Sequence, residues 1–229
     1  MARPLVKKHD IEQAAIRLFA AKGLARVTIK DIAAEAGVTE GALYRHYPGK
    51  NEMAWALFTQ ELERFAIPLG DRLFAPGQTF ARRLHGAIRF MYEYYRKEPV
   101  VFAFIMLTQH GFPEEDLLTE ATNPNDMAVR FVREAMAARA MPEGDPLLPA
   151  ALLIGLTLQP LVMHRYGRLA LTEEIADQAV AAALRALELQ PAAGAARRPP
   201  GERRGLGRTP VMVRPHKYVN IYLLTKEPV

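Results

Sequence analysis

The 229-residue sequence contains no cysteine. This absence excludes a disulfide framework, a thiol nucleophile and every metal or iron–sulfur site that depends on cysteine ligands. The six histidines do not replace those ligands, because no two of them show the His-x-x-x-His spacing of a helical metal site. A Gly-rich phosphate loop is also missing. We therefore expect neither a bound metal nor a cofactor.

A long uninterrupted hydrophobic run is missing too. The most apolar stretch, residues 147–163, is broken by Pro149, Gly155 and Pro160 and is shorter than the roughly 20 residues that span a bilayer. Two lysines near the N-terminus are followed by an amphipathic segment rather than by the apolar segment of a secretory signal. We therefore expect a cytoplasmic protein without a membrane span, in which residues 147–163 form a buried or interface helix.

Charge is plentiful but unevenly distributed. The net charge is +5, with nine Lys and Arg against five Asp and Glu in residues 1–50, thirteen against eighteen in 51–190, and eight against two in 191–229. A basic head on an acidic body indicates that the head binds a polyanion. The Pro-, Gly- and Arg-rich tail has a composition typical of disorder; it either adds non-specific affinity for DNA or has no role.

Helical periodicity is strong in the basic head. Apolar residues recur on one face of residues 7–22, and again on one face of a short segment that begins after Thr28. The Thr28 hydroxyl can cap that second segment, and Asp31 completes a weak capping box. Because this segment is only about nine residues long, it must pack against the first helix to be stable.

A glycine-containing turn follows the second segment. In Gly37-Val38-Thr39, the glycine can take the left-handed conformation, Val38 can fill the angle between two helices, and Thr39 can cap a third segment, residues 40–47. Two short helices joined in this way are a helix-turn-helix. The second helix of this arrangement can enter the major groove of DNA.

The third segment carries side chains suited to that groove. Gly41 and Ala42 are small enough to let the backbone approach base edges, whereas Tyr44, Arg45 and His46 offer a hydroxyl, a guanidinium and an imidazole. Leu43 and Tyr47 are expected to point inward, and Lys50 is placed to meet a phosphate. Alternatives remain: Tyr44 as a core aromatic, Arg45 as a solvated cation, and His46 in a structural role.

The run from Thr28 to Lys50 resembles the N-terminal signature of TetR-family transcriptional regulators. It contains Ala-Gly-Val-Thr, then Leu-Tyr-x-x-Tyr, and a lysine six residues after the first of these tyrosines. The resemblance covers about residues 7–55, and Tyr47 departs from the phenylalanine that is more frequent in the family. It implies phosphate contacts by Thr28, Thr39, Tyr44 and Lys50, base-edge contacts by Glu40, Gly41, Ala42 and Arg45, and either kind by His46. Glu40 is unusual at such a position and either accepts from a cytosine amino group or points to solvent.

The sequence pattern of the acidic body indicates helices throughout. We expect further helices over residues 51–65, 79–97, 125–140, 147–166 and 172–189. The apolar run 100–107 fits either a buried strand or a buried helix, and its helical surroundings favour a helix. The predicted fold class is therefore all-α, with about nine helices. Its predicted domains are a helix-turn-helix domain at 1–65 (motif 28–50), a ligand-binding and dimerisation domain at 66–190, and a tail at 191–229.

The body is expected to pair two copies and to bind a small molecule. Residues 147–189 would form the two helices of a homodimer interface that spaces two heads on a palindromic operator. The predicted pocket for an apolar effector is lined by Phe90, Tyr94, Phe104, Met127, Phe131, Gln159 and Met163. Ordinary core packing is the alternative for each of these side chains.

These features favour a ligand-responsive, DNA-binding transcriptional regulator. The resemblance implies a repressor that is released from its operator by the effector. The alternatives are an activator and a non-specific architectural protein that binds double-stranded DNA. An all-helical enzyme is disfavoured, because no nucleophile motif, metal cluster or phosphate loop is visible.

Overall fold

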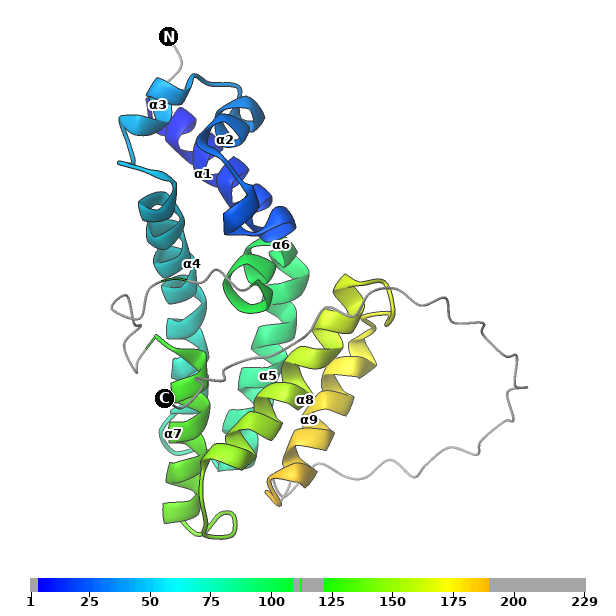
Figure 1. Ribbon diagram of the computed structural model, residues 1–229. Helices are drawn as coiled ribbons and strands as arrows, with labels where there is room; N and C mark the ends of the chain where they lie inside the picture. The colour runs from blue at the N-terminus through cyan, green and yellow to red at the C-terminus, as the bar shows by residue number, and fades with distance from the viewer. Residues whose placement is uncertain (1–3, 109–111, 113–121, 190–229) are drawn as a thin grey trace, which may run out of the picture. The chain divides into compact units, whose positions relative to one another are not determined.

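The computed structural model describes residues 4–108, 112 and 122–189, and these residues belong to one compact unit. The tail predicted at 191–229 lies outside them. The described ranges contain nine α-helices and no strand, in agreement with the all-α prediction. Figure 1 follows the helices in chain order.

Three helices form the N-terminal head. They are α1 (Pro4–Lys22), α2 (Ile29–Ala36) and α3 (Glu40–Tyr44), and a short 3-10 turn, η1 (Leu24–Arg26), joins the first two. Helix α1 ends where the sequence predicted, at Gly23 with φ of 76°. The buried Ile32 of α2 and Leu43 of α3 join the α1 residues in one hydrophobic core. The short helices are therefore held by packing rather than by their own stability.

Helix α4 (Lys50–Leu73) is longer than predicted. The sequence placed its end at residue 65, before Pro68, but the helix continues for two more turns. The buried side chains of Phe65, Leu69 and Leu73 lie on both sides of the proline and pack in the hydrophobic core. That burial outweighs the single backbone hydrogen bond that a proline cannot donate. The domain boundary predicted at 65/66 therefore lies inside a continuous helix.

The next elements along the chain are two helices and a π-helical segment. Helix α5 (Phe80–Lys97) begins after Thr79, whose hydroxyl accepts from the Arg82 backbone. The ambiguous run 100–107 is helical, as favoured: α6 (Pro99–Phe102) continues into a π-helical segment, η2 (Ala103–Leu107). In Figure 1, α6 lies directly below α1. A strand is excluded here because these residues make local helical hydrogen bonds.

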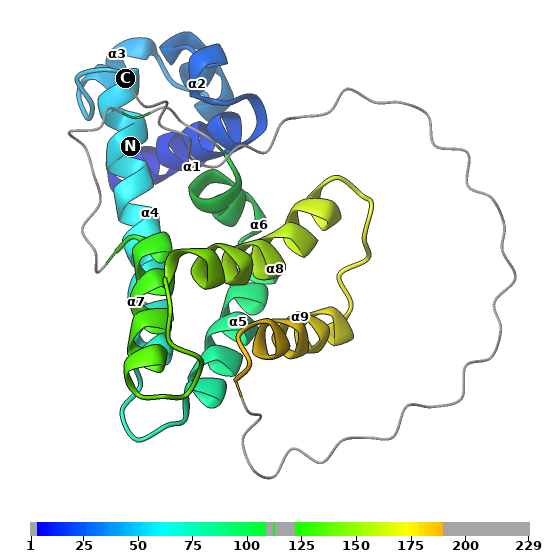
Figure 2. The same cartoon turned by 60° about the horizontal axis from the view of Figure 1, so that its bottom comes forward.

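Three helices complete the body: α7 (Pro124–Ala137), α8 (Leu147–Arg165) and α9 (Glu173–Ala186). Their positions agree with the predicted segments to within three residues at each end. Both views show α8 beside α9, with α9 against α5 (Figures 1 and 2).

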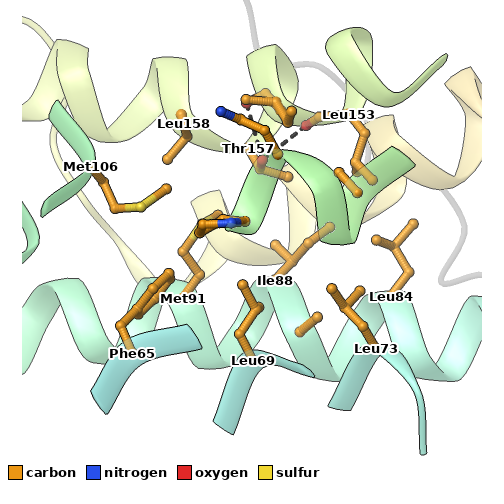
Figure 3. Close-up of a pocket in the computed structure, with 15 residues that line it drawn as sticks. Phe65, Leu69, Leu73, Leu84, Ile88, Met91, Met106, Leu153, Thr157 and Leu158 are labelled. Atoms are coloured by element: carbon orange, nitrogen blue, oxygen red, sulfur yellow. Dashed lines mark hydrogen bonds between the residues drawn. The ribbon is translucent and has the colours of Figure 1, made fainter. Parts of the chain in front are cut away.

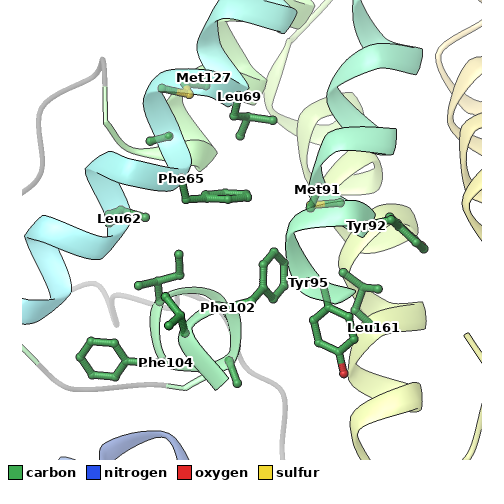
Figure 4. Packing of buried hydrophobic residues seen from close by; sticks show 14 of the residues in the cluster. Leu62, Phe65, Leu69, Met91, Tyr92, Tyr95, Phe102, Phe104, Met127 and Leu161 are labelled. Atoms are coloured by element: carbon green, nitrogen blue, oxygen red, sulfur yellow. The ribbon is translucent and has the colours of Figure 1, made fainter. Parts of the chain in front are cut away.

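One hydrophobic core runs through both head and body. Phe19 of α1 stacks on Phe104 of η2 with ring centroids 6.1 Å apart. Figure 4 shows Phe65 of α4, Phe102 of α6 and Tyr95 of α5 facing one another, and the centroids of Phe65 and Phe102 are 5.6 Å apart. Because aromatic rings connect α1 to the body, a change in the body can reach the head through packed side chains.

Candidate functional site

Helix α2 begins with the capping box that the sequence predicted. The Thr28 hydroxyl accepts from the Asp31 backbone N–H at 3.2 Å, and the Thr28 backbone N–H donates to the Asp31 carboxylate at 2.8 Å. The Thr28 hydroxyl also donates to that carboxylate at 2.6 Å. Hydrogen bonding from the Thr28 side chain is the largest cause of a lowered pKa at Asp31. Thr28 is thus fixed at an exposed helix N-terminus, where backbone N–H groups favour an anion.

The turn between α2 and α3 has the predicted geometry at its glycine. Gly37 ends α2 in the left-handed region, with φ of 64° and ψ of 35°. Val38 packs against the core from the angle between the helices. Thr39 occupies the capping position of α3, but its side chain makes no capping hydrogen bond, contrary to prediction. The Thr39 hydroxyl is exposed and can therefore form a hydrogen bond with another partner.

Helix α3 presents one face to solvent and the other to the core. Leu43 is fully buried, whereas Glu40, Gly41 and Tyr44 are exposed, and the Tyr44 side chain is 54% accessible. The alternative that Tyr44 is a core aromatic is therefore wrong. Ala42 differs from the prediction that it faces base edges, because it is only 8% exposed. It neighbours Leu43 on the inward side of the helix, since adjacent helical residues are about 100° apart.

The third helix is shorter than predicted and ends at Tyr44 rather than at residue 47. The His46 backbone N–H donates to the Leu43 carbonyl at 2.8 Å, which tightens the chain into a turn. Pro48 disfavours helical geometry at the residue before it. Arg45 and His46 are consequently exposed on a turn that directly continues the exposed face.

Three polar contacts brace this face from behind. The Tyr47 hydroxyl donates to Glu12 of α1 at 2.6 Å, and burial, followed by this hydrogen bond, raises the pKa of Tyr47. Arg17 of α1 pairs with Glu35 of α2 at 3.2 Å. These contacts fix α2 and the end of α3 on α1.

The third contact involves Lys50, which the sequence placed on a phosphate. Its ammonium group donates to the Leu24 carbonyl at 2.9 Å, so it ties the start of α4 to the η1 turn. Lys50 is half-buried, unlike the other polar side chains of this face. An ammonium group has three donors, so this bond leaves two available. The structure thus brings together the exposed predicted residues, which are Thr28, Thr39, Glu40, Gly41, Tyr44, Arg45 and His46.

Comparison with known proteins places the head in a family. Residues 11–57 match the family model for bacterial regulatory proteins of the tetR family. The head therefore carries the N-terminal domain of that family. The chain is 51% identical over 50 residues to the HTH-type transcriptional regulator TtgR of Pseudomonas putida, covering 22% of this chain and 24% of that protein. It is 35% identical over 99 residues to the nucleoid occlusion factor SlmA of Pasteurella multocida, covering 43% of this chain and 48% of that protein.

The chain spans less than half the length of these curated relatives. A longer match comes from the fold. A solved TetR family transcription regulator from Marinobacter aquaeolei superposes with a TM-score of 0.63 at 19% identity, covering 79% of this chain and 95% of that one. At this identity the match concerns the fold alone. The head is therefore related to known regulators by sequence, and the body by architecture.

The body of the chain contains an apolar cavity of about 60 Å³. Figure 3 shows its walls: Phe65 and Leu69 from α4, Met91 from α5, and Thr157 and Leu158 from α8. The buried Thr157 hydroxyl donates to the Leu153 carbonyl at 2.8 Å. The cavity thus offers an apolar surface with few polar groups.

None of the seven predicted pocket residues lines this cavity. Phe104 and Phe131 are fully buried in the core, and Phe131 packs edge-on against Phe80 at 5.6 Å. Met127 is also buried, while Gln159 is exposed. The other three are partly buried, and these are Phe90, Tyr94 and Met163. Helical spacing in the sequence indicated which faces of α4 and α5 are apolar. It did not indicate where the helices that face one another leave a space between them.

Helix α8 exposes apolar side chains on the face away from the core. Leu147, Leu148 and Leu152 are 60%, 67% and 48% accessible, whereas Leu153 and Leu161 are buried. By length and composition alone, α8 could cross a membrane, which no other helix in the described ranges could do. In this fold α8 packs against α7 and α9. A core or interface helix passes the same test of length and composition.

A long-range contact missed by the sequence analysis connects this helix to the head. The guanidinium of Arg165, at the C-terminal end of α8, donates to the Ala20 carbonyl near the end of α1 at 2.7 Å. The two residues are 145 positions apart, so no local pattern could reveal the contact. It gives α8 a direct polar connection to the N-terminal head.

Proposed function

We propose that this chain is a sequence-specific DNA-binding transcriptional regulator, acting in the cytoplasm as a repressor. The observation that carries the proposal is the exposed face of α3, where Tyr44 stands 54% accessible beside the buried anchor Leu43. The exposed Tyr44 side chain on this braced helix is placed to bind a partner outside the fold. The TetR family membership of residues 11–57 supports DNA as that partner.

Phosphate contacts are assigned to the rim of this face. Thr28 and Thr39 offer exposed hydroxyls at the starts of α2 and α3, and Tyr44 adds a third. Lys50 can keep its bond to Leu24 and donate a second hydrogen bond to the DNA backbone. Such contacts set the position of the head without reading sequence.

Base recognition is assigned to the centre of the face. Arg45 can donate two hydrogen bonds to guanine, and Glu40 can accept one from a cytosine amino group. Gly41 presents no side chain and permits close approach of the backbone. His46 contacts either a base or a phosphate. Ala42 is withdrawn from this set, because it is only 8% exposed.

Two copies are proposed to pair through α8 and α9. The exposed leucines of α8 and the open surface at Gly155, where a Cβ would meet nothing within 4 Å, form a self-complementary apolar face. A two-fold axis through this face would bury the leucines and place two heads on a palindromic operator. Burial of these side chains at a protein interface also explains an apolar α8 without a membrane.

The effector is proposed to be a small apolar molecule that enters the cavity between α4, α5, α7 and α8. The present volume of about 60 Å³ is well below the roughly 300 Å³ of small-molecule sites, so the walls must separate on binding. The flexible side chains of Met91 and Met106 can move most easily. Because α4 is continuous from the cavity to Lys50, its displacement would turn the head.

The test is a gel-shift titration on operator DNA selected from a random library. Arg45→Ala should weaken specific binding by about tenfold to a hundredfold, since a bidentate base contact contributes about 1–3 kcal/mol. Arg133→Ala is the matched control, because Arg133 is exposed on α7, far along the chain from the head. Tyr44→Ala should weaken binding while dimerisation persists. Equally tight binding of wild-type protein to scrambled DNA would refute specific regulation and favour an architectural role.

The experiment also separates the remaining alternatives. An activator would bind the same operator but raise transcription from it in a reporter assay. No catalytic role is proposed, because the relatives and the fold are those of regulators. Within the described residues, no three His, Asp or Glu side chains are grouped as metal ligands would be.

A further inference from the structure

A second cavity lies where α1 of the head meets the body. Its volume is about 250 Å³, and it shares no lining residue with the apolar cavity. Its walls are mostly polar and come from four helices and the residue after α5. The lining residues are His9 and Gln13 from α1, Glu61 and Arg64 from α4, Tyr94 from α5, Glu98, and the apolar Val101 from α6. A cavity of this size and polarity at a junction of helices is suited to a small hydrophilic molecule.

The carboxylate of Glu61 is the most unusual wall group. Glu61 is only 3% exposed, although carboxylates are rarely buried without full pairing. It accepts from one guanidinium nitrogen of Arg64 at 3.1 Å to each oxygen, and from Gln60 at a marginal 3.5 Å. The Arg64 side chain is itself 67% exposed. Since a carboxylate has about four acceptor positions, Glu61 can accept further hydrogen bonds.

A neutral hydroxyl faces the same space. Tyr94 lines the cavity, and its hydroxyl has no hydrogen-bond partner among the residues that the structure describes. Burial, followed by the charge of Glu61, raises the pKa of Tyr94, so the hydroxyl keeps its proton. It can therefore donate to a ligand or accept from one.

The charges around the cavity determine what it would bind. Glu61 and Glu98 contribute two negative charges and Arg64 one positive charge, and with His9 neutral the wall carries a net charge of −1. An ammonium group would satisfy the free acceptor positions of Glu61 in a partly desolvated setting, where charged hydrogen bonds are strong. An anionic ligand would be repelled by this carboxylate, and a neutral donor would lack the charge that strengthens the hydrogen bond.

We propose that this junction cavity is a second ligand site, separate from the apolar one, and that it takes a small organic cation with an ammonium group and a second hydrogen-bonding group. The ammonium would bind Glu61, and the second group would reach Tyr94 or Gln13. The ligand would contact α1 of the head together with α4 and α5 of the body. Occupancy would therefore restrict rotation of the head. This last consequence rests on the proposed DNA-binding function, whereas the site itself does not.

Binding is tested on the full chain without DNA, by calorimetric titration with 1,4-diaminobutane. 1,4-Butanediol is the matched probe, because it has the same chain length without charge. We expect the diamine to bind one site per chain and the diol to give no heat of binding. Glu61→Gln should weaken diamine binding by about tenfold or more, as expected for loss of a charged hydrogen bond. Glu63→Gln, an exposed position on the same helix, should leave it unchanged.

A second variant keeps the test valid if Glu61→Gln unfolds. Tyr94→Phe retains the ring packing against Phe65 and should weaken binding several-fold, with helical content unchanged by circular dichroism. Absence of diamine binding to wild-type protein at millimolar concentration would overturn the proposal. Equal binding by the diol, or equal losses in Glu61→Gln and Glu63→Gln, would do the same. None of these outcomes affects the DNA-binding proposal, which the operator titration tests separately.

Discussion

Replacing Gly37 by alanine tests whether the turn between α2 and α3 depends on left-handed geometry. Gly37 has φ of 64°, and a Cβ added there would meet nothing within 4 Å. The substitution therefore creates no clash, and its cost is the backbone strain alone. That strain is about 1–2 kcal/mol, partly offset by about 0.4–1 kcal/mol from the lower entropy of the unfolded chain. We expect a net destabilisation of about 1 kcal/mol.

Gly41→Ala, four residues further on, is the matched control. A Cβ at Gly41 would also meet nothing within 4 Å, but this glycine lies inside α3 with ordinary helical geometry. Alanine should stabilise the protein there by about 0.5 kcal/mol. Because Gly41 is exposed on the proposed DNA face, the added methyl group should weaken operator binding, whereas Gly37→Ala should affect it little.

Thermal unfolding followed by circular dichroism measures the stability of both variants. For a domain of this size, 1 kcal/mol corresponds to a shift of about 2–4 °C in the midpoint. The midpoint should fall for Gly37→Ala and rise slightly for Gly41→Ala. If Gly37→Ala left the midpoint unchanged or raised it, the argument that this turn requires a left-handed residue would be refuted.

Three further predictions concern the interface, the head–body contact and acid stability. Leu152→Arg should convert the dimer into a folded monomer in sedimentation velocity, and persistence of the dimer would place the interface elsewhere. Arg165→Met should remove the hydrogen bond to Ala20 and lower the free energy of unfolding by about 1 kcal/mol in urea titrations; an unchanged value would show that the bond contributes nothing. Thr28→Val should destabilise the protein above about pH 4, where the lowered pKa of Asp31 contributes stability. The difference from wild type should shrink as pH falls below 3.8, the ordinary pKa of Asp31, and a pH-independent difference would contradict this assignment.

The proposed coupling between the apolar cavity and the head rests on one continuous helix and one distant hydrogen bond. Helix α4 lines the apolar cavity with Phe65 and Leu69 and begins in the head at Lys50. The Arg165 bond to Ala20 joins the end of α8 to the end of α1. An effector that separates α4 from α8 would therefore act on the head at two places.

Elements whose signals are local could be predicted from the sequence. The capping box at Thr28, the left-handed Gly37 and the buried Leu43 follow from side-chain chemistry within a few residues, and the structure confirms each of them. The all-α class and the approximate helix positions follow from helical periodicity in the same way. The exposed face of α3 was also predictable, because it is the complement of its buried face.

Features that depend on packing between distant segments could not be predicted from the sequence. Helix α4 passes through Pro68 because buried neighbours in the core outweigh a local helix-breaking signal. The apolar cavity lies where α4, α5, α7 and α8 fail to meet, and an apolar side chain such as Phe104 or Met91 has the same local pattern whether it fills the core or lines a gap. The polar junction cavity likewise combines residues from α1, α4 and α5 that no sequence spacing relates. Periodicity fixes the face of a helix, but the shape of the space between helices depends on all of their partners at once.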